Sequence, residues 1–209
     1  MICTFGDVLL DVIVRLSSEL APGADTPAET RLATGGQAAN VAAWVVELGG
    51  SARCVAKRAD DAAGTLARTL LEARGVELAG PVAAGTTGTV VALVSADGER
   101  TMATDRGVSV ELRADELEPA WFEGCSWLHL SGYALLAEPI AEAALAAARL
   151  ARAREARVAV DLSCGARSAR TGPSASAPTS TPPRPTSSLP TSPSGRWSAA
   201  PTRSRRRPS

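Results

Sequence analysis

The sequence lacks the features of a membrane protein, a secreted disulfide scaffold and a zinc-binding module. It has no long uninterrupted hydrophobic run, its first residues contain no basic segment, and Asp7 and Asp11 interrupt the first apolar stretch. The four cysteines are scattered without the paired spacing of a metal site. They are Cys3, Cys54, Cys125 and Cys164. These absences predict a cytoplasmic protein without a membrane span, a signal peptide or a structural metal.

Acidic residues are missing from the C-terminal part of the chain. All 22 acidic residues lie at or before Asp161, whereas 8 of the 22 basic residues fall within the last 46 positions. Residues 164–209 also contain 9 Pro, 11 Ser and 6 Thr but only one Leu and one Trp, which is too little apolar surface for a core. The 209 residues therefore predict one globular body, residues 1–163, and a disordered Pro/Ser/Thr/Arg-rich tail, residues 164–209.

Two explanations of this tail are open. It is either a natural tail, whose arginines at 203–207 contact acidic partners, or the product of a shifted reading frame. The body has 13 Arg, a single Lys and many Ala and Gly, as GC-rich coding sequences do, and such sequences read out of frame yield Pro, Ser, Thr and Arg. Because the tail has no lysine and no interleaved aromatic residues, we do not expect it to bind nucleic acid.

Short apolar segments alternate with helical patterns through the body, which is typical of an α/β fold. The expected strands are residues 3–8, 52–56, 126–130 and 157–162, and the expected helices are residues 38–48, 66–74 and 139–156. Helical spacing predicts one apolar stripe on each of the first two helices. The stripes are Val41, Trp44, Val45 and Leu48 on the first helix, and Leu66, Leu70 and Ala73 on the second.

Two further pairs of segments do not fit this alternation. Residues 87–95 and 100–104 flank an Ala-Asp-Gly-Glu turn at 96–99, which predicts an antiparallel hairpin. Residues 12–16 and 29–33 are expected to pair in the same way. The sequence therefore predicts a small second sheet beside the main one.

The segment Gly35-Gly36-Gln37-Ala38-Ala39-Asn40 leads directly into the first helix. Two glycines before a helix allow the backbone to approach a ligand closely, and the first-turn amides can donate hydrogen bonds to it. The carboxamide of Asn40 can both donate to and accept from hydroxyl groups. Taken alone, the segment also fits an ordinary strand-to-helix turn.

Other segments occur with this turn in a recognisable order. They are residues 6–11 (Gly-Asp-Val-Leu-Leu-Asp), 59–64 (Ala-Asp-Asp-Ala-Ala-Gly), 97–100 (Asp-Gly-Glu-Arg), 105–107 (Asp-Arg-Gly), 129–133 (His-Leu-Ser-Gly-Tyr) and 158–161 (Val-Ala-Val-Asp). In order and spacing the chain resembles the PfkB, or ribokinase-like, family of sugar and nucleoside kinases over about residues 2–163. The resemblance implies a mostly parallel sheet flanked by helices, with a small β lid. It also implies ATP-dependent phosphorylation of a sugar hydroxyl with ATP and Mg²⁺, a sugar-like ligand, and a homodimer formed through the lid.

The resemblance assigns substrate-binding roles to several residues. Asp11 matches the acceptor of a substrate hydroxyl, and Gly35, Gly36 and Asn40 match the sugar-binding turn. Arg106 and Gly132 are expected to line the same pocket, although an exposed arginine and a plain turn glycine would explain them as well. Gln37 stands where ribokinase-type members often carry Lys, and His129 is expected to be a packed core residue.

The second signature of the family, Gly-Ala-Gly-Asp, does not occur in the sequence. In the family it supplies an anion hole and the base that deprotonates the attacking hydroxyl. No Gly-x-x-x-x-Gly-Lys-Ser/Thr loop replaces it. We therefore expect a truncated carbohydrate kinase with no catalytic or metal residues, no binding of ATP and Mg²⁺, and no activity. The alternative is a non-catalytic sugar-binding or regulatory protein.

Overall fold

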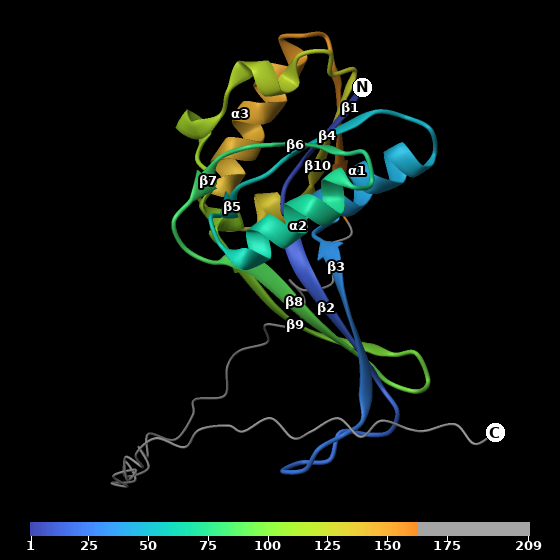
Figure 1. Cartoon of the computed structure of the whole chain (residues 1–209). Helices are drawn as coiled ribbons and strands as arrows, with labels where there is room; N and C mark the ends of the chain where they lie inside the picture. Colours follow the sequence, from blue (N-terminus) through green and yellow to red (C-terminus); the bar gives the residue numbers. More distant parts are fainter. Residues whose placement is uncertain (163–209) are drawn as a thin grey trace, which may run out of the picture. The chain divides into compact units, whose positions relative to one another are not determined.

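The computed structural model describes residues 1–162. The predicted tail, residues 164–209, lies outside the described residues. Within them, no helix is long and apolar enough to cross a membrane. The chain forms two main sheets, one in the body and one in the lid (Figure 1).

The body is built on a five-stranded parallel sheet with the strand order β11-β10-β1-β4-β6. The strands are β1 (Ile2–Phe5), β4 (Ala52–Val55), β6 (Glu77–Ala79), β10 (Trp127–Ser131) and β11 (Arg157–Asp161). Four of these five match predicted strands. The mostly apolar strands form a parallel sheet with helices on both faces, as the α/β pattern predicts.

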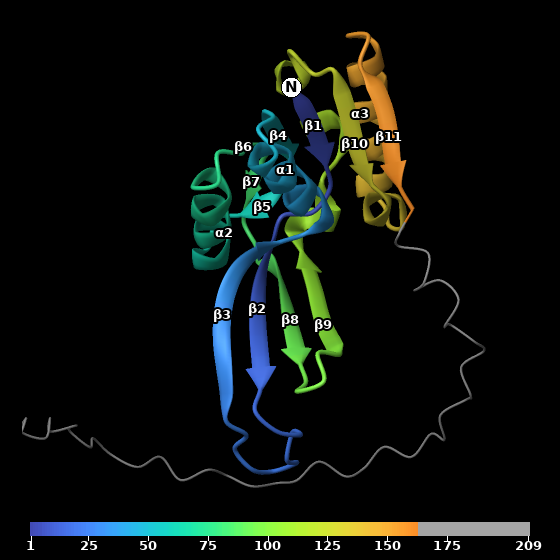
Figure 2. The ribbon, with the colours of Figure 1, turned by 90° about the vertical axis from the view of Figure 1, so that its right-hand side faces the viewer.

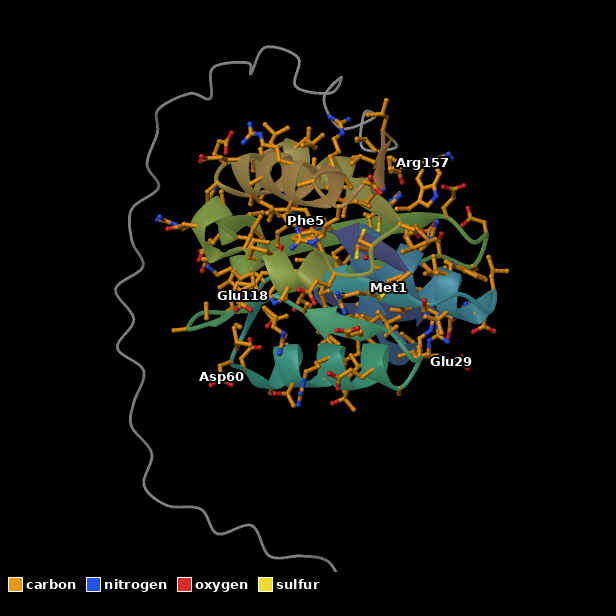
Figure 3. The ribbon with its side chains drawn as sticks, turned by 90° about the horizontal axis from the view of Figure 1, so that it is seen from above. Met1, Phe5, Glu29, Asp60, Glu118 and Arg157 are labelled. Carbon is orange, nitrogen blue, oxygen red and sulfur yellow. The ribbon has the colours of Figure 1, made fainter. Side chains whose placement is uncertain are left out.

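Helices cover both faces of this sheet. On one face, α1 (Gln37–Glu47) and α2 (Ala62–Glu72) share an apolar cluster with β4. On the other face, α3 (Ile140–Arg152) packs against Phe5, which lies in the interior between the helix and the sheet (Figure 3). The predicted parallel sheet flanked by helices is confirmed.

The lid is a four-stranded sheet with the order β3-β2-β8-β9, and it extends away from the body sheet (Figure 2). Its strands are β2 (Leu9–Leu16), β3 (Ala28–Gly35), β8 (Thr87–Val94) and β9 (Arg100–Gly107). Both predicted antiparallel pairs form, and β2 and β8 join them in parallel. Three of these strands, β2, β3 and β9, extend beyond their predicted ranges, whereas β8 ends one residue earlier than predicted.

Several short elements were not predicted. Two-residue strands β5 (Arg58–Ala59) and β7 (Val82–Ala83) pair in parallel. Residues 1–162 also form four 3₁₀ helices: η1 (Val108–Glu111), η2 (Ala114–Glu116), η3 (Pro119–Phe122) and η4 (Gly132–Leu135). Elements of two to four residues are too short to give a periodic sequence signal.

The apolar stripe expected on α1 is not the face by which this helix packs most closely on the sheet. The buried residues of this helix are Ala38, Ala39, Ala42 and Ala43. Trp44 and Leu48, which belong to the predicted stripe, are 62% and 82% exposed. Small side chains let the helix lie close to the sheet. Within the expected stripe, Val45 is partly buried against the same apolar cluster.

On α2 the fully buried residues are Gly64, Ala67 and Leu71, while Leu66 and Leu70 of the expected stripe are half-buried. A Cβ on Gly64 would lie 2.3 Å from the carbonyl oxygen of Ala59, so the helix approaches the preceding strand at a point that only glycine allows. The helix also begins four residues earlier than predicted, because Asp61 caps its N-terminus.

Candidate functional site

A pocket of about 410 Å³ lies between the start of α1, the lid sheet and η4. Its polar lining consists of Asp7, Asp11, Gln37, Asn40, Thr104 and Arg106. Gly36 and the apolar or aromatic residues Leu9, Val41, Trp44, Val90, Met102 and Tyr133 complete it. Its volume and mixed lining suit a small-molecule ligand.

The two glycines before α1 are explained by what packs on them. A Cβ on Gly35 would lie 1.7 Å from Oδ1 of Asp11, so the carboxylate is seated directly over this glycine. Gly36 has φ +93°, and a Cβ there would lie 2.2 Å from the carbonyl oxygen of Asp7. Side chains at these positions would displace Asp11 and push α1 away from the β1–β2 connection.

Asp11 is a half-buried carboxylate on β2 that faces the pocket. Burial raises the pKa of Asp11 above its ordinary value. Within residues 1–162, no protein group donates a hydrogen bond to this side chain. Its oxygens are therefore available to hydroxyl groups of a ligand, which would replace the water lost on burial.

Asn40 lies in the first turn of α1, and its backbone N–H donates to the carbonyl oxygen of Gly36 (2.9 Å). Its side chain is exposed, lines the pocket, and makes no hydrogen bond within the described part of the chain. The pocket thus holds a carboxylate that only accepts hydrogen bonds when ionised and a carboxamide that accepts and donates them. This combination suits a ligand with neighbouring hydroxyl groups.

Arg106 also reaches the pocket, and Asp7 holds it in place. Its Nε and Nη2 donate to the two carboxylate oxygens of Asp7 at 3.0 and 2.8 Å. Ser109 Oγ lies 3.0 Å from Oδ1 of the same carboxylate, which is almost fully buried. This paired geometry fixes the guanidinium, while its other N–H groups make no hydrogen bond within residues 1–162.

Not all residues that the sequence predicted for the site line the pocket. Asp11, Gly36, Asn40 and Arg106 line one pocket, while Gly35 lies behind Asp11. Gly132 is buried at the start of η4, and its neighbour Tyr133 lines the pocket instead.

Gln37 links the start of α1 to two strands of the body sheet. Ser131 Oγ donates to Gln37 Oε1 (2.5 Å), and Gln37 Nε2 donates to Asp161 Oδ2 (2.7 Å). The first contact reaches the end of β10, and the second reaches the end of β11. An amide can accept from one group and donate to the other, which the ammonium group of a lysine cannot do.

Six other pocket residues were not predicted as site residues. They are Leu9, Val41, Trp44, Val90, Met102 and Thr104. Val41 and Trp44 did carry a signal, because Val41 lies four positions beyond Gln37 and Trp44 lies four positions beyond Asn40, the spacing of one helix face. On β9, Met102, Thr104 and Arg106 occupy alternate positions, a pattern that shows that they share one face of the sheet but not what this face contacts.

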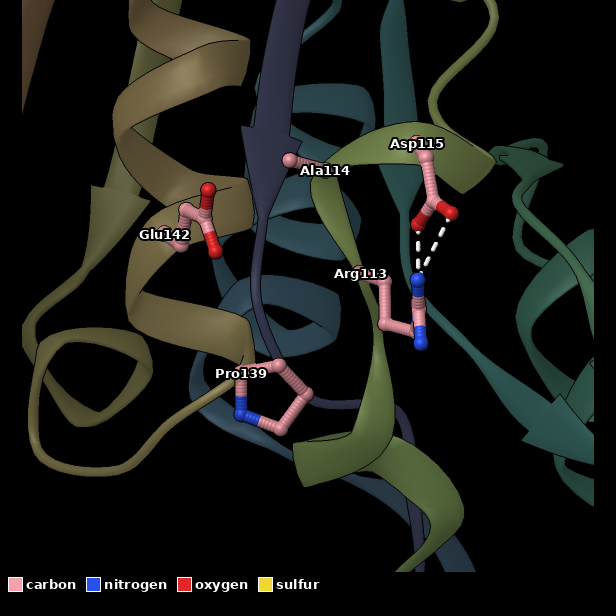
Figure 4. A pocket seen from close by; sticks show the side chains of 5 residues that line it. All are labelled: Arg113, Ala114, Asp115, Pro139 and Glu142. Carbon is pink, nitrogen blue, oxygen red and sulfur yellow. Dashed lines mark hydrogen bonds and ion pairs between the residues drawn. The ribbon is translucent and has the colours of Figure 1, made fainter.

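A second hollow, of about 450 Å³, lies between η2 and the start of α3 (Figure 4). Its lining residues are Arg113, Ala114, Asp115, Pro139 and Glu142. Arg113 and Asp115 are mostly exposed and form a pair with each other, with contacts of 2.8 and 2.7 Å. Since these charges already satisfy one another and no sequence motif reaches the hollow, the pocket beneath the lid is the better candidate.

Within residues 1–162, no group of three or more His, Cys, Asp or Glu side chains is placed to hold a metal ion. Cys3, Cys54 and Cys125 are buried and free. Burial raises the pKa of the Cys54 thiol to about 12, which keeps it protonated and unreactive at neutral pH.

Comparisons with known proteins agree on one family. A family model described as "pfkB family carbohydrate kinase" matches residues 1–170. The chain is 33% identical over 165 residues to fructokinase-1 of Zea mays, covering 77% of this chain and 50% of that protein. It is 35% identical over 131 residues to the ATP-dependent ribose-1-phosphate kinase of Halopiger xanaduensis, covering 60% of this chain and 44% of that protein.

Solved structures give the same result. Adenosine kinase from Sinorhizobium meliloti superposes with a TM-score of 0.68 at 27% identity, covering 79% of this chain and 58% of that one. Fructokinase from Xylella fastidiosa superposes with a TM-score of 0.65 at 25% identity, covering 78% and 50%. The chain thus spans about half the length of the curated relatives that it matches.

Proposed function

Because the chain belongs to the pfkB family of carbohydrate kinases, we propose that residues 1–162 form the substrate-binding portion of an ATP-dependent sugar kinase. One observation carries this proposal: the unpartnered carboxylate of Asp11 and the unpartnered carboxamide of Asn40 line one pocket beneath a β lid. A site built on hydrogen bonds to hydroxyl groups rejects ligands that lack them, because its polar groups would then be buried unpaired.

In this proposal each polar group has a distinct task. Asp11 accepts a hydrogen bond from a ligand hydroxyl, and Asn40 donates to or accepts from a neighbouring one. Arg106, held by Asp7, donates to a ligand oxygen. Gly35 and Gly36 hold Asp11 and α1 close enough for these groups to contact one ligand.

The residues present do not fit ATP and Mg²⁺. The sequence contains neither Gly-Ala-Gly-Asp nor a phosphate-binding Gly-x-x-x-x-Gly-Lys-Ser/Thr loop, and the described residues offer no cluster of metal ligands. We therefore derive no phosphoryl-transfer step for this chain and propose that it binds substrate without turnover. Because its named relatives are kinases, nothing in the comparisons favours the alternative of a dedicated non-catalytic sugar-binding protein.

The test is calorimetric titration of the 209-residue chain with the compounds in the names of its relatives: D-fructose, D-ribose 1-phosphate and adenosine. We expect at least one to bind, and we expect Asp11→Ala and Asn40→Ala each to weaken binding about tenfold or more, since each removes hydrogen bonds to hydroxyl groups. Asp25→Ala is the matched control, because Asp25 is an exposed acid outside the pocket.

Two outcomes would contradict the proposal. Equal binding by wild type and Asp11→Ala would place the ligand elsewhere, and ATP-dependent product formation by the purified chain would refute the absence of turnover. A cytoplasmic location and a homodimer paired through the lids remain predictions, and light scattering of the purified chain measures the second.

A further inference from the structure

The body sheet has an open edge at β11. This strand stands at one end of the strand order, and within residues 1–162 no other strand pairs with its outer side (Figure 2). Val160, in the strand, and Leu162, immediately after it, are 42% and 76% exposed. An open edge presents unpaired N–H and C=O groups and is a template for pairing with another chain.

The opposite edge of the same sheet is protected against such pairing. Strand β6 at that edge has only three residues and is followed by Gly80 and Pro81. Short strands, proline and lysine are the usual means by which proteins prevent pairing at an edge. β11 has five residues, Arg-Val-Ala-Val-Asp, and contains no proline, glycine or lysine. It therefore lacks this protection and carries one charge of each sign at its two ends.

The backbone groups of β11 that face outward belong to its two valines. The N–H of Arg157 donates to the carbonyl oxygen of Ser126, on the side of β10 (3.0 Å). Successive residues of a strand direct their backbone groups to alternate edges. Ala159 therefore faces β10 as Arg157 does, whereas Val158 and Val160 direct their N–H and C=O groups away from the sheet.

The two charged side chains of β11 lie on the same face of the sheet, because they are an even number of positions apart. Asp161 accepts a hydrogen bond from Gln37 Nε2 at 2.7 Å, at the start of α1. The guanidinium of Arg157 lies over the ring of Trp127, 5.3 Å from the ring centroid. These contacts keep both charges on the α1 side, whereas Val158 packs against the α3 cluster on the other side.

A second copy of β11 matches this edge. When two copies pair antiparallel about a twofold axis at Ala159, Val158 of each copy faces Val160 of the other, and their outward N–H groups meet outward C=O groups. In the same register Arg157 of each copy faces Asp161 of the other, and directly opposite charges stabilise a strand pair. Moving the axis to either valine places Ala159 opposite a charged residue and loses both charge pairs.

We propose that the chain forms a twofold dimer in which two β11 strands pair antiparallel about Ala159 and join the two body sheets into one continuous sheet. The charge pattern favours a second copy as the partner, because the strand is complementary to itself. Pairing uses the open edge of both copies, so this interface closes at two chains. β11 is not a lid strand, so the proposed interface is separate from any pairing of the lids.

The first test removes an outward hydrogen-bond donor. Light scattering and sedimentation of the full 209-residue chain over a concentration series measure the dissociation constant of the dimer. Val160→Pro removes an N–H that does not bond within the body sheet, so the fold should persist, and we expect it to weaken association about tenfold or more. Val160→Thr keeps the N–H and the branched shape and is the matched control. Thermal melts confirm that each variant is folded.

Charge reversal tests the register. Arg157→Glu and Asp161→Lys each place like charges opposite one another, so each variant alone should associate about tenfold more weakly than wild type. When the two variants are mixed, opposite charges face each other again at both positions. We therefore expect mixed dimers to form with an affinity within about threefold of wild type, measured by sedimentation with one variant fluorescently labelled.

An introduced thiol locates the twofold axis. Ala159 faces its own copy in a non-hydrogen-bonded pair, where the Cα atoms lie about 4.5 Å apart, within the range of a disulfide. In a Cys164→Ser background the remaining native cysteines are buried. Diamide, which takes up two hydrogens from two thiols, should then convert Ala159→Cys into a disulfide-linked dimer. Val160→Cys is the matched control and should not cross-link, because position 160 faces Val158 of the other copy.

Each result decides the inference. A monomer at every concentration overturns it, because the edge is then covered within the chain or by a different partner. Equal association of wild type and Val160→Pro also overturns it, because the dimer then uses another surface, such as the lids. Failure of the mixed charge variants to associate, or equal cross-linking at positions 159 and 160, rules out the proposed register. None of these outcomes depends on sugar binding, so the proposed function is tested separately.

Discussion

The carboxylate of Asp11, which lies directly over Gly35, is partly buried in a position that favours ligand binding but lowers the stability of the ionised, unliganded protein. Burial raises its pKa, and no protein hydrogen bond within residues 1–162 offsets the lost water. Because the folded-state pKa is raised, folding favours the protonated carboxyl. The protonated carboxyl therefore contributes its full stability to the folded state below the ordinary carboxyl pKa. This contribution is lost as pH rises through the raised folded-state pKa.

The raised pKa of Asp11 leads to a prediction for the variant Asp11→Asn. At pH 7 the variant should be more stable than wild type, by about 0.5 kcal/mol or more in the free energy of unfolding, because it removes a half-buried charge. The gain should vanish at about pH 3.5, where the wild-type carboxyl is also neutral. Urea unfolding at both pH values measures the difference, and Asp25→Asn, at an exposed acid, should show no such gain. Lower stability of Asp11→Asn at pH 7 would contradict this account.

At the scale of elements, the junction between α2 and the lid depends on Asp61. Its Oδ1 accepts from the N–H of Gly64 (2.7 Å) and from the hydroxyl of Thr87 (2.7 Å), and its Oδ2 accepts from the N–H of Thr87 (2.9 Å). Desolvation works to raise the pKa of Asp61, but these hydrogen bonds together outweigh it and lower the pKa. One side chain thus caps a body helix and holds the first residue of β8.

Replacing Asp61 should therefore loosen two elements at once. We expect Asp61→Ala to lower the free energy of unfolding by about 2 kcal/mol, since it removes the cap and leaves the buried Thr87 without its acceptor. The loss should shrink as pH falls through the lowered pKa of Asp61, where wild type also loses the charge. Chemical denaturation over pH 3 to 7 measures both effects.

The neighbouring acid provides the control for this prediction. Asp60 is exposed and lies on the outside of the molecule near α2 (Figure 3), and its side chain makes no hydrogen bond to any other described residue. Asp60→Ala should change stability by no more than about 0.5 kcal/mol. If both variants lose the same amount, the hydrogen bonds of Asp61 do not hold the junction.

The helices also show how far the sequence could predict this structure. Two features could be predicted from the sequence because each has a periodic or motif signal. They are the order of the long strands and helices, and the Gly35-Gly36 turn with Asn40. The face of α1 that packs on the sheet could not be predicted, because small alanines pack against the sheet while the larger Val41 and Trp44 line the pocket. Helical spacing indicated a shared face correctly, but it could not distinguish an apolar ligand site from a core.

At the scale of the whole molecule, β11 is the edge strand of the body sheet. Within residues 1–162, no strand pairs with its outer edge, and Leu162, immediately after it, is 76% exposed. The family match ends at residue 170, close to the point where acidic residues disappear from the sequence. The family match and the composition therefore both change within about the same stretch, which is a reason to examine the reading frame there.

We expect the genomic nucleotides downstream of the Ser163 codon to contain, one base out of the present frame, an open frame that encodes further α/β pattern and a Gly-Ala-Gly-Asp segment. The reason lies in the composition of residues 164–209, which contain a single Leu and a single Trp and so offer too few apolar residues to encode further α/β pattern in the present frame. Resequencing the gene from its source tests this directly, and absence of such a frame would establish the tail as natural. The corrected protein should phosphorylate its sugar with ATP, whereas the 209-residue chain should only bind it.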